Sequence, residues 1–561
     1  MDSRQKASPA ALGPQNHAKD GFSKDYSTLT LLFCLWLLAF SIRLLWIWPL
    51  NYNDWFGDAA YNVRIAEDIA EGKDATWVGR NSPFFVFTPL FHLLVALVII
   101  ISPLTGMTAA KAVSALFTSF VPPSLYMLIY RLTERKPEAL TGALIATFVP
   151  WFLAMSVMTL ATGLYIALAI ASCTALICVQ GNKRIPISLT FAGFAALSRP
   201  EGAFLLLFTM IWILIMAFRH ENSAEWRTAL LSVSLIGVGV VAAMMVIWLW
   251  RANDPFVWIV SMLEHQADEA QKGKLTFAEF GYLALIILAT YSGFGGDPEP
   301  VKFDLYNVFR IGFAISLLLL MAYGFWVIVR NWRNGNFSKE VQEGYYFIFS
   351  LWIAMLVFLI LLDGRWIKYH VLGVMMIQPL LVSFAVFDLA KQLSLSPAAV
   401  RWLGARSNSS TIFLVVLLGI LSIQFSFAFA TNAFLKSQMW EPRREMVEWL
   451  NKTVPEDVIV VIPHREYYVT AYTQTSSVTY ADLYDDANLT QDDLNQARLL
   501  NLLNQSGVLF LVTTSDVDRQ NNPYYSQIVE LVSNRTTIEF TAKFEWRSLS
   551  IRISALKVIL V

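Results

Sequence analysis

This 561-residue sequence has few cysteines, no net charge and none of several common catalytic motifs. Its three cysteines, Cys34, Cys173 and Cys178, lie inside apolar segments, so there is no disulfide framework and no thiolate metal cluster. Lys and Arg total 42, as do Asp and Glu, and the resulting zero net charge argues against a nucleic-acid partner. No Gly-rich loop ends in Lys-Ser/Thr, and His-Glu-x-x-His and Gly-x-Ser-x-Gly are absent, so nucleotide-driven transport and serine hydrolysis lack their usual motifs.

Hydrophobic residues, by contrast, make up 56% of the chain, and only 15% of it is charged. They fall in uninterrupted stretches, more than a soluble core can bury, so most of these stretches are predicted to cross a bilayer. Residues 1–27 are polar and are predicted to form a cytoplasmic tail. Residues 28–50 are too long for a signal-peptide core and have no small-residue cleavage site, so they are predicted to be an uncleaved first span.

The basic loops predict the topology. All of them lie on one face if each neighbouring pair is separated by two spans, and the positive-inside rule makes that face cytoplasmic. These loops carry Arg131, Arg135 and Lys136; Lys183 and Arg184; Arg219 and Arg227; Arg330, Arg333 and Lys339; and Lys391, Arg401 and Arg406. The spans that satisfy this pattern, about eleven by hydropathy and charge, are 28–50, 109–130, 139–155, 163–180, 185–198, 203–218, 228–250, 306–329, 344–362, 370–390 and 411–431. The N-terminus is then inside and the C-terminus outside, in a membrane that we expect to be the plasma membrane of a prokaryote.

Two further apolar stretches, 84–102 and 280–292, do not fit as crossings, because either one would reverse the sign of every later loop. Both are therefore predicted to be helices that lie along or dip into the membrane. This prediction creates two long external loops, 51–108 and 251–305. Function usually concentrates in long ordered loops on a rigid scaffold.

The composition changes after the multi-span domain 28–431. Residues 457–462 and 507–513 alternate as strands do, and 440–452 and 489–505 have the pattern of amphipathic helices. Residues 432–561 are therefore predicted to form a small soluble α/β domain outside the membrane. Asn-x-Ser/Thr tripeptides agree with that location, at Asn451, Asn488, Asn504 and Asn534. The predicted fold class is thus a polytopic α-helical membrane protein with a C-terminal α/β domain.

An acidic residue follows the first span. Asp58 belongs to the segment Gly57–Arg64, which precedes a predicted helix through Gly72. A carboxylate held at the membrane surface can ligate a metal, take a proton or orient a polar acceptor. The alternative is a solvated loop carboxylate.

The second long loop carries Glu264 and His265 before a polar run. With Asp58 they form an oxygen- and nitrogen-lined set that suits Mg²⁺ or Mn²⁺, in which Asp58 and Glu264 are the candidate metal ligands. The alternative is the ordinary polar surface of a helix end.

Charged residues also interrupt two span boundaries. Arg199 and Glu201 lie where two short spans meet, and charges at that depth must pair with each other or face a polar cavity. Both substrate contact and a structural ion pair fit them. Arg365 and Lys368 lie between two spans on the predicted external side, where they suit phosphate oxygens. Interfacial anchoring is the alternative for this second pair.

Several of these segments resemble the catalytic subunit of oligosaccharyltransferase, a C-type (GT-C) glycosyltransferase. Its first external loop carries Asp-Pro-Trp-Phe-Asn-Tyr-Arg, to which Asp58, Asn62 and Arg64 are identical and in which Tyr61 replaces Phe. Its later loop carries Ser-Val-Ser-Glu-His-Gln, which Ser261, Glu264, His265 and Gln266 match. The resemblance implies that Arg365 contacts a donor pyrophosphate, that Tyr61, Arg64 and His265 contact substrate, and that a protein asparagine is the acceptor.

The sequence also departs from that family. Thr162-Gly163-Leu164 stands where active members have Asp-x-Glu, and residues 463–468 replace Trp-Trp-Asp-Tyr-Gly, which reads the acceptor sequon. The segment Ser198–Gly202 resembles instead other C-type enzymes, which move single sugars from polyprenyl phosphates.

The predicted function is therefore transfer of a sugar or oligosaccharide from a polyprenyl (dolichyl) phosphate or diphosphate donor to an acceptor on the extracytoplasmic face. Asp58 and Glu264 would be catalytic, and the substrate would contact Tyr61, Arg64, His265, Arg365, Lys368, Arg199 and Glu201. The expected partners are the lipid-linked donor, membrane lipid and a protein or glycan acceptor. Three alternatives remain: a monosaccharide transferase of the mannosyl or aminoarabinose type, a catalytically silent oligosaccharyltransferase paralogue, and a transporter. The only clear helix break, at Pro200, has no evident counterpart of the kind that transporters show.

Overall fold

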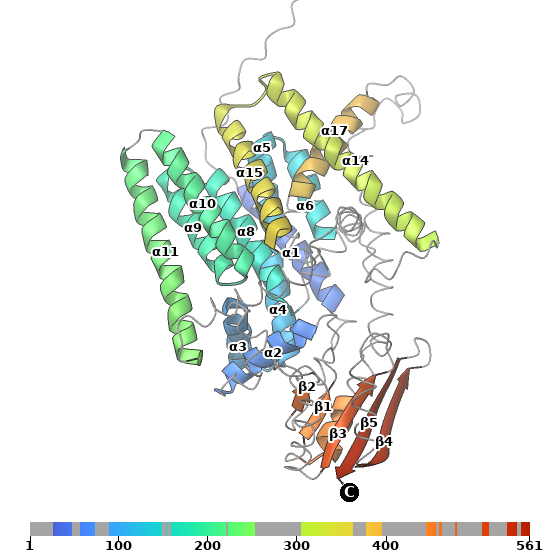
Figure 1. Ribbon diagram of the computed structural model, residues 1–561. Helices are drawn as coiled ribbons and strands as arrows, with labels where there is room; N and C mark the ends of the chain where they lie inside the picture. The colour runs from blue at the N-terminus through green and yellow to red at the C-terminus, as the bar shows by residue number, and fades with distance from the viewer. Residues whose placement is uncertain are drawn as a thin grey trace, which may run out of the picture.

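The computed structural model is a helical bundle with a mixed β-sheet at one end (Figure 1). It describes residues 26–47, 57–72, 89–148, 153, 159–219, 223–252, 305–362, 377–394, 445–455, 459–462, 477–479, 508–514, 536–546 and 551–560. Its α-helices in the bundle are α1 (Tyr26–Ile47), α2 (Gly57–Ala70), α3 (Leu90–Ile101), α4 (Gly106–Thr118), α5 (Val121–Thr133), α6 (Lys136–Phe148), α8 (Ala161–Cys178), α9 (Arg184–Ala196), α10 (Pro200–Arg219), α11 (Ser223–Ala252), α14 (Leu305–Arg333), α15 (Lys339–Leu362) and α17 (Ile377–Ser394).

Each predicted span other than 411–431 overlaps a helix, and 411–431 lies outside the described residues. Among the described residues, five helices or helix pairs are long and apolar enough to cross a membrane. They are Tyr26–Leu45, Gly106–Thr133, Ala161–Cys178, Pro200–Arg219 and Ala224–Ile247. The chain is therefore a polytopic helical membrane protein, and the count of eleven spans stays a prediction.

The predicted span 109–130 is divided into α4 and α5. The division falls at Ser119 and Phe120, which form a turn, and prolines occupy the first turn of α5 as Pro122 and Pro123. Proline has no backbone N–H and its fixed φ suits the first turn of a helix, so a new helix begins here in place of continuous helix. The apolar run predicted the burial of this segment but not its division.

The segment 84–102, predicted to be a lateral helix, contains the helix α3. Its 12 residues extend only about 18 Å, well short of the roughly 30 Å hydrocarbon core. This length agrees with a helix that does not cross the membrane. The second predicted lateral helix, 280–292, lies outside the described residues.

The basic loops gather at one end of the bundle. Arg184 at the start of α9 donates to Glu225 at the start of α11 over 2.6 Å. The Tyr345 hydroxyl of α15 donates to the Leu132 carbonyl near the end of α5. The opposite end of the bundle carries α2, α3 and the sheet (Figure 1). This separation is what the charge pattern of the loops predicts.

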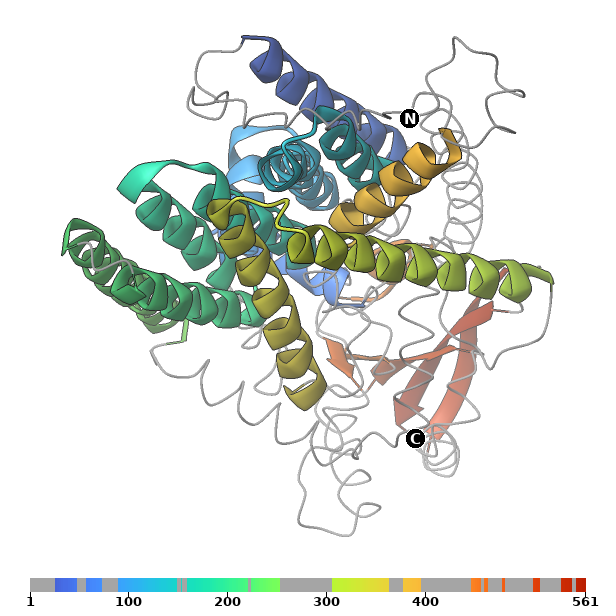
Figure 2. The same ribbon diagram turned by 90° about the horizontal axis from the view of Figure 1, so that it is seen from above.

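Helices α14 and α17 are also joined at the basic end. Asp388 of α17 accepts hydrogen bonds from Arg330 (2.5 Å) and from the Tyr323 hydroxyl (2.6 Å) of α14. Seen from this end, α15 lies between α11 and α14, and α17 lies beside α14 (Figure 2). The network therefore fixes a late pair of helices at the same end as the earlier basic loops.

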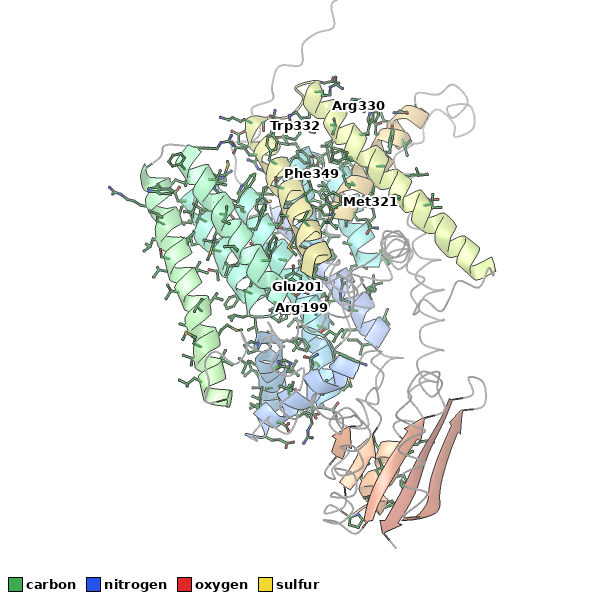
Figure 3. All side chains as sticks on the ribbon, viewed as in Figure 1. Arg199, Glu201, Met321, Arg330, Trp332 and Phe349 are labelled. Carbon is green, nitrogen blue, oxygen red and sulfur yellow. The ribbon has the colours of Figure 1, made fainter. Side chains whose placement is uncertain are left out.

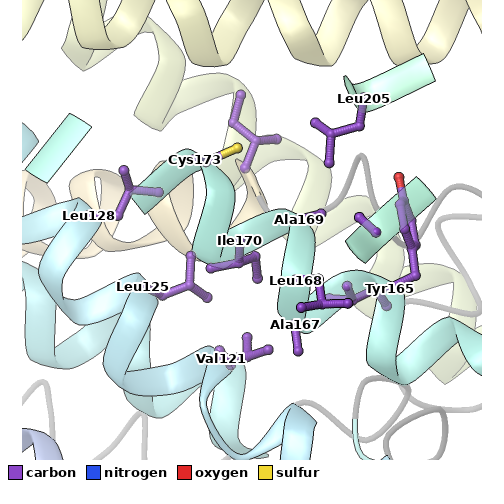
Figure 4. Close-up of a cluster of buried hydrophobic side chains, with 14 of the residues drawn as sticks. Val121, Leu125, Leu128, Tyr165, Ala167, Leu168, Ala169, Ile170, Cys173 and Leu205 are labelled. Atoms are coloured by element: carbon purple, nitrogen blue, oxygen red, sulfur yellow. The ribbon is translucent and has the colours of Figure 1, made fainter. Parts of the chain in front are cut away.

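The core of the bundle is built around α8, which packs against α4, α5 and α9. Leu168 and Ile170 of α8 lie among Val121 and Leu125 of α5 (Figure 4). Small residues elsewhere let backbones approach closely, because a Cβ on Gly202 would lie 2.0 Å from the Ala195 carbonyl oxygen. Such contacts are the usual basis of helix association in lipid, where burial of apolar surface gives no driving force.

The C-terminal sheet has the strand order β2-β1-β3-β5-β4. Its strands are β1 (Ile459–Ile462), β2 (Ser477–Thr479), β3 (Val508–Thr514), β4 (Thr536–Trp546) and β5 (Ile551–Leu560). β1 is parallel to β2 and β3, whereas β5 is antiparallel to β3 and β4. β1 and β3 occur where strands were predicted, and a helix at 445–453 falls inside the predicted helix 440–452. β4 and β5 were not predicted, and the extracytoplasmic location of this region stays a prediction.

Candidate functional site

Helix α2 carries the first predicted motif. Asp58 is its second residue and Tyr61 its fifth, so both belong to the N-terminal turns of the helix, although their side chains lie outside the described residues. The exposed N–H groups at a helix N-terminus stabilise negative charge. The backbone therefore places residue 58 where a carboxylate, or a phosphate near it, is favoured.

Asn62 joins α2 to α3. The imidazole Nε2 of His92 lies 2.6 Å from the Asn62 Oδ1, and both side chains are buried. With Nε2–H as donor, the amide oxygen is satisfied without water. Asn62, which matches the family motif, is thus part of the contact between α2 and α3.

Arg64 forms an ion pair with Asp68 one turn later on α2, at 3.2 Å. On the same helix Glu67 approaches Gly106, whose backbone N–H donates to its carboxylate at the start of α4. Burial raises the pKa of Glu67 above its ordinary value, an effect opposed by Arg64 and by the Gly106 N–H. Glu67 therefore holds α2 against α4, whereas the Arg64–Asp68 ion pair lies within α2.

Two buried cations were missed by the sequence analysis. Lys111 of α4 is 1% exposed, and Arg43 of α1 is fully buried and donates to the Thr118 hydroxyl and the Ala39 carbonyl, each at 3.0 Å. A lone Lys or Arg within an apolar run is the signal that would have found them, because an intramembrane charge marks a functional position by default.

Arg199 and Glu201 are brought together at the start of α10. The Arg199 Nε and Nη2 donate to the two carboxylate oxygens of Glu201 at 3.0 and 2.9 Å, and its Nη1 donates to the Thr162 hydroxyl at 2.7 Å. Their side chains are 18% and 5% exposed. Both lie toward the α2–α3 end and away from Arg330 and Trp332 (Figure 3). The predicted pairing is confirmed, and Thr162, at the place of the family's acidic motif, is the third member of the cluster.

Helix α3, in the first predicted external loop, contacts the corner that carries this cluster. The Leu90 N–H, at the start of α3, donates to the Leu197 carbonyl at the end of α9 over 2.9 Å. Helix α2 packs in turn on α3 and α4, and α4 packs on α8. Hence α2, α3, the N-terminus of α8 and the α9–α10 corner form one side of a candidate site at the end opposite the basic loops.

The remaining predicted site residues are not placed. Glu264, His265, Arg365 and Lys368 lie outside the described residues. Within the described part of the chain, no three His, Cys, Asp or Glu side chains are grouped as metal ligands. A cation is also disfavoured beside Thr162, whose hydroxyl accepts from the positively charged Arg199. These residues do not fit a divalent cation, so Mg²⁺ or Mn²⁺ binding stays a prediction that depends on Asp58 and Glu264.

No protein-family model and no curated protein sequence matches this chain. Solved structures do match. The chain resembles ArnT from Cupriavidus metallidurans bound to undecaprenyl phosphate, with 11% identity and a TM-score of 0.56 over 94% of this chain and 98% of that chain. The same protein in the apo state matches at 12% identity and a TM-score of 0.56, over 94% of this chain and 98% of that one. The Archaeoglobus fulgidus oligosaccharyltransferase, in complex with Zn and sulfate, matches at 14% identity and a TM-score of 0.53 over 89% of this chain and 69% of that chain.

These likenesses extend over nearly the whole chain, from the helical bundle to the C-terminal region. The chain therefore has the fold of the C-type glycosyltransferases, in a divergent form.

Proposed function

We propose that this chain is a C-type glycosyltransferase that transfers a sugar from a polyprenyl phosphate or diphosphate donor to an acceptor on the extracytoplasmic face. One observation carries the proposal. Helix α2, with Asp58 in its first turn, packs on α3, and α3 is hydrogen-bonded to the α9–α10 corner beside Arg199, at the end of the bundle opposite the basic loops, in a fold shared with a protein crystallised with undecaprenyl phosphate.

The proposed chemistry follows from the residue types. Asp58 would take the proton of the acceptor nucleophile as that atom attacks the anomeric carbon. The bond from this carbon to the donor's phosphate oxygen breaks, the lipid phosphate leaves, and the configuration inverts. Arg365 and Lys368 would hold the phosphate, and Glu264 and His265 would close over the acceptor. Tyr61 and Arg64 would contact the substrate beside Asp58.

Two reactions fit this proposal: transfer of an oligosaccharide to a protein asparagine, and transfer of a single sugar. The second is favoured by Thr162, because its hydroxyl is bound to Arg199 at the place where the oligosaccharyltransferase motif has acids. Arg199 and Glu201 would shape the donor side of the site as a pair, since a separated charge at that depth is costly. No step of this reaction is assigned to a metal.

The test is transfer from a radiolabelled polyprenyl-linked sugar pool by the purified full-length chain, with Mg²⁺, Mn²⁺ or EDTA. Loss of transfer in Asp58→Ala and Glu264→Ala is expected, because the first removes the proposed base and the second removes a group that closes over the acceptor. Glu71→Ala, at the exposed C-terminal end of the same helix, is the matched control and should leave transfer unchanged.

The arms with and without EDTA decide whether Asp58 and Glu264 bind a metal. If the wild-type protein showed no turnover but bound the donor in a way that depended on Arg365, the proposal that it is an enzyme would be rejected. That result would instead support the silent paralogue, which the replacement of Asp-x-Glu by Thr162-Gly163-Leu164 favours.

A further inference from the structure

A cavity of about 230 Å³ lies at the basic end of the bundle, remote from α2 and α3. It is lined by the ends of α5, α8, α9, α10, α11 and α15 and by the Val179–Gly181 turn. Its volume is below the roughly 300–1,000 Å³ of pockets that enclose a drug-sized ligand. The cavity therefore suits a headgroup-sized ligand.

Charges of both signs line the cavity. Arg131 comes from the last turn of α5, and Glu340 and Glu343 come from the first turns of α15. Arg184 and Glu225 form the 2.6 Å ion pair that joins α9 to α11 in its wall. Guanidinium groups suit phosphate oxygens, and carboxylates accept the N–H donors of an ammonium group. The lining thus matches a zwitterion of phosphate and primary ammonium.

Apart from Gln180, the remaining side chains of the lining are apolar and include Trp212 and Met216 of α10 and Phe347 of α15. Elsewhere on the same two helices, Phe218 of α10 is 77% and Tyr346 of α15 is 53% exposed. Large exposed apolar side chains on membrane-spanning helices face lipid, so α10 and α15, whose ends line the cavity, also border the hydrocarbon. An acyl chain attached to the bound headgroup would continue along these two helices.

The walls of the cavity are held in place. A Cβ on Gly344 would lie 2.8 Å from the Leu132 Cδ2, so α15 lies close against α5, and the Tyr345 hydroxyl bonds to the Leu132 carbonyl at 3.2 Å. The pKa of Glu340 is held below its ordinary value by its own backbone N–H and by the Ser338 hydroxyl, with a smaller effect of Arg131. Glu340 is therefore an anion at neutral pH.

We propose that this cavity binds the phosphoethanolamine headgroup of an aminophospholipid of the cytoplasmic leaflet, with its phosphate on Arg131 and its ammonium group on Glu340 and Glu343. This site is separate from the proposed transfer reaction, and neither depends on the other. Bound lipid would hold α15 beside α5 and α10, three helices whose ends line the cavity.

The test is native mass spectrometry of the purified full-length chain after equilibration with an equimolar mixture of phosphatidylethanolamine, phosphatidylcholine and phosphatidylglycerol of identical acyl chains. We expect preferential retention of phosphatidylethanolamine. Arg131→Gln and the double variant Glu340→Gln/Glu343→Gln should each reduce that retention about tenfold, as expected for loss of a hydrogen bond to a charged group. Arg333→Gln and Glu134→Gln, exposed residues at the same end, are matched controls that should retain wild-type selectivity.

If the double glutamine variant folds poorly, reversing the charge of Glu340 and Glu343 provides a second test. Glu340→Lys/Glu343→Lys should transfer the preference to phosphatidylglycerol, whose headgroup has no ammonium. Equal retention of the three lipids by wild type would overturn the proposal, as would a phosphatidylethanolamine preference that survives both the Arg131 and the double glutamine variants.

A second measurement distinguishes the lipid from a soluble source of the same chemistry. The midpoint of thermal unfolding is followed with free phosphoethanolamine, with inorganic phosphate and with short-chain phosphatidylethanolamine. The lipid should raise the midpoint at far lower concentration than either soluble compound. Equal potency of free phosphoethanolamine would contradict a lipid as the occupant.

Discussion

The imidazole Nε2 of His92 and the amide Oδ1 of Asn62 are 2.6 Å apart in a contact from which water is excluded. This hydrogen bond connects α2, which has Asp58 as its second residue, to a helix whose first N–H is bound to the α9–α10 corner. Residue 58 precedes Asn62 by four residues, one helical turn. The position of the proposed catalytic carboxylate therefore depends on a contact between two short helices.

Replacing either partner of that contact should lower stability. Asn62→Ala or His92→Ala leaves a buried polar group unsatisfied, which costs about 1–3 kcal/mol. The double variant should cost less than the sum of the two, because the residues interact directly. Thermal unfolding of the purified protein measures these effects, with Thr190→Ala, on the exposed side of α9, as control. Additive losses would mean that the two side chains do not interact.

The Arg199–Glu201 pair allows a structural role to be separated from a role in substrate binding. Arg199→Met leaves the nearly buried Glu201 carboxylate without its bidentate partner and should cost about 3 kcal/mol or more. Arg199→Met/Glu201→Leu removes both charges and should restore most of that stability. Unfolding midpoints and donor transfer are compared in the two variants. A stable but inactive double variant would assign substrate contact to the pair, whereas a stable and active one would limit it to structure.

Glu67 should make stability dependent on pH. Because its pKa is raised in the folded protein, the folded state retains the proton longer than the unfolded state does. The resulting stabilisation is complete below the ordinary glutamate pKa of 4.5 and is lost as the pH rises through the folded value. Glu67→Gln should therefore gain stability relative to wild type as the pH rises above 4.5. Unfolding measured from acidic to neutral pH checks the direction, and a gain that is constant across this range would contradict it.

A single methyl group added at Gly202 should push α9 and α10 apart. Gly202→Ala brings a Cβ within 2.0 Å of the Ala195 carbonyl oxygen, which is backbone and cannot rotate away. Overpacking of this kind costs roughly 1–3 kcal/mol. Gly239→Ala in α11, where the added Cβ would meet nothing within 4 Å beyond the backbone of its own helix, is the matched control and should be neutral or stabilising. Similar unfolding midpoints for the two variants would show that the α9–α10 contact is not close.

The helices of the bundle were predictable because each apolar run is a local property of the sequence. Residues 163–180 were predicted as a span, and α8 is Ala161–Cys178. The strand prediction was less complete. Ile538, Phe540 and Phe544 of β4 alternate with Glu539 and Lys543, a period-two pattern that the sequence analysis did not use.

The site was only partly predictable, since its contacts join distant segments. Arg199 needed a partner at its depth, and Glu201, two residues away, was an obvious one. Thr162 lies 37 residues earlier and His92 lies 30 residues after Asn62, and no spacing rule connects such pairs. Helix packing alone brings them together.

The buried Arg43 also has a consequence for how the protein is made. Its partner Thr118 follows 75 residues later in the chain. At about 5–20 residues per second, a ribosome takes on the order of several seconds to reach it. During that delay α1 stands in the bilayer with a guanidinium group that its later partner does not yet satisfy. Because Arg43 is close to the end of α1, its long side chain can extend to the headgroups until α4 arrives. The buried contact of Arg43 with Thr118 can therefore form only after α4 has been synthesised.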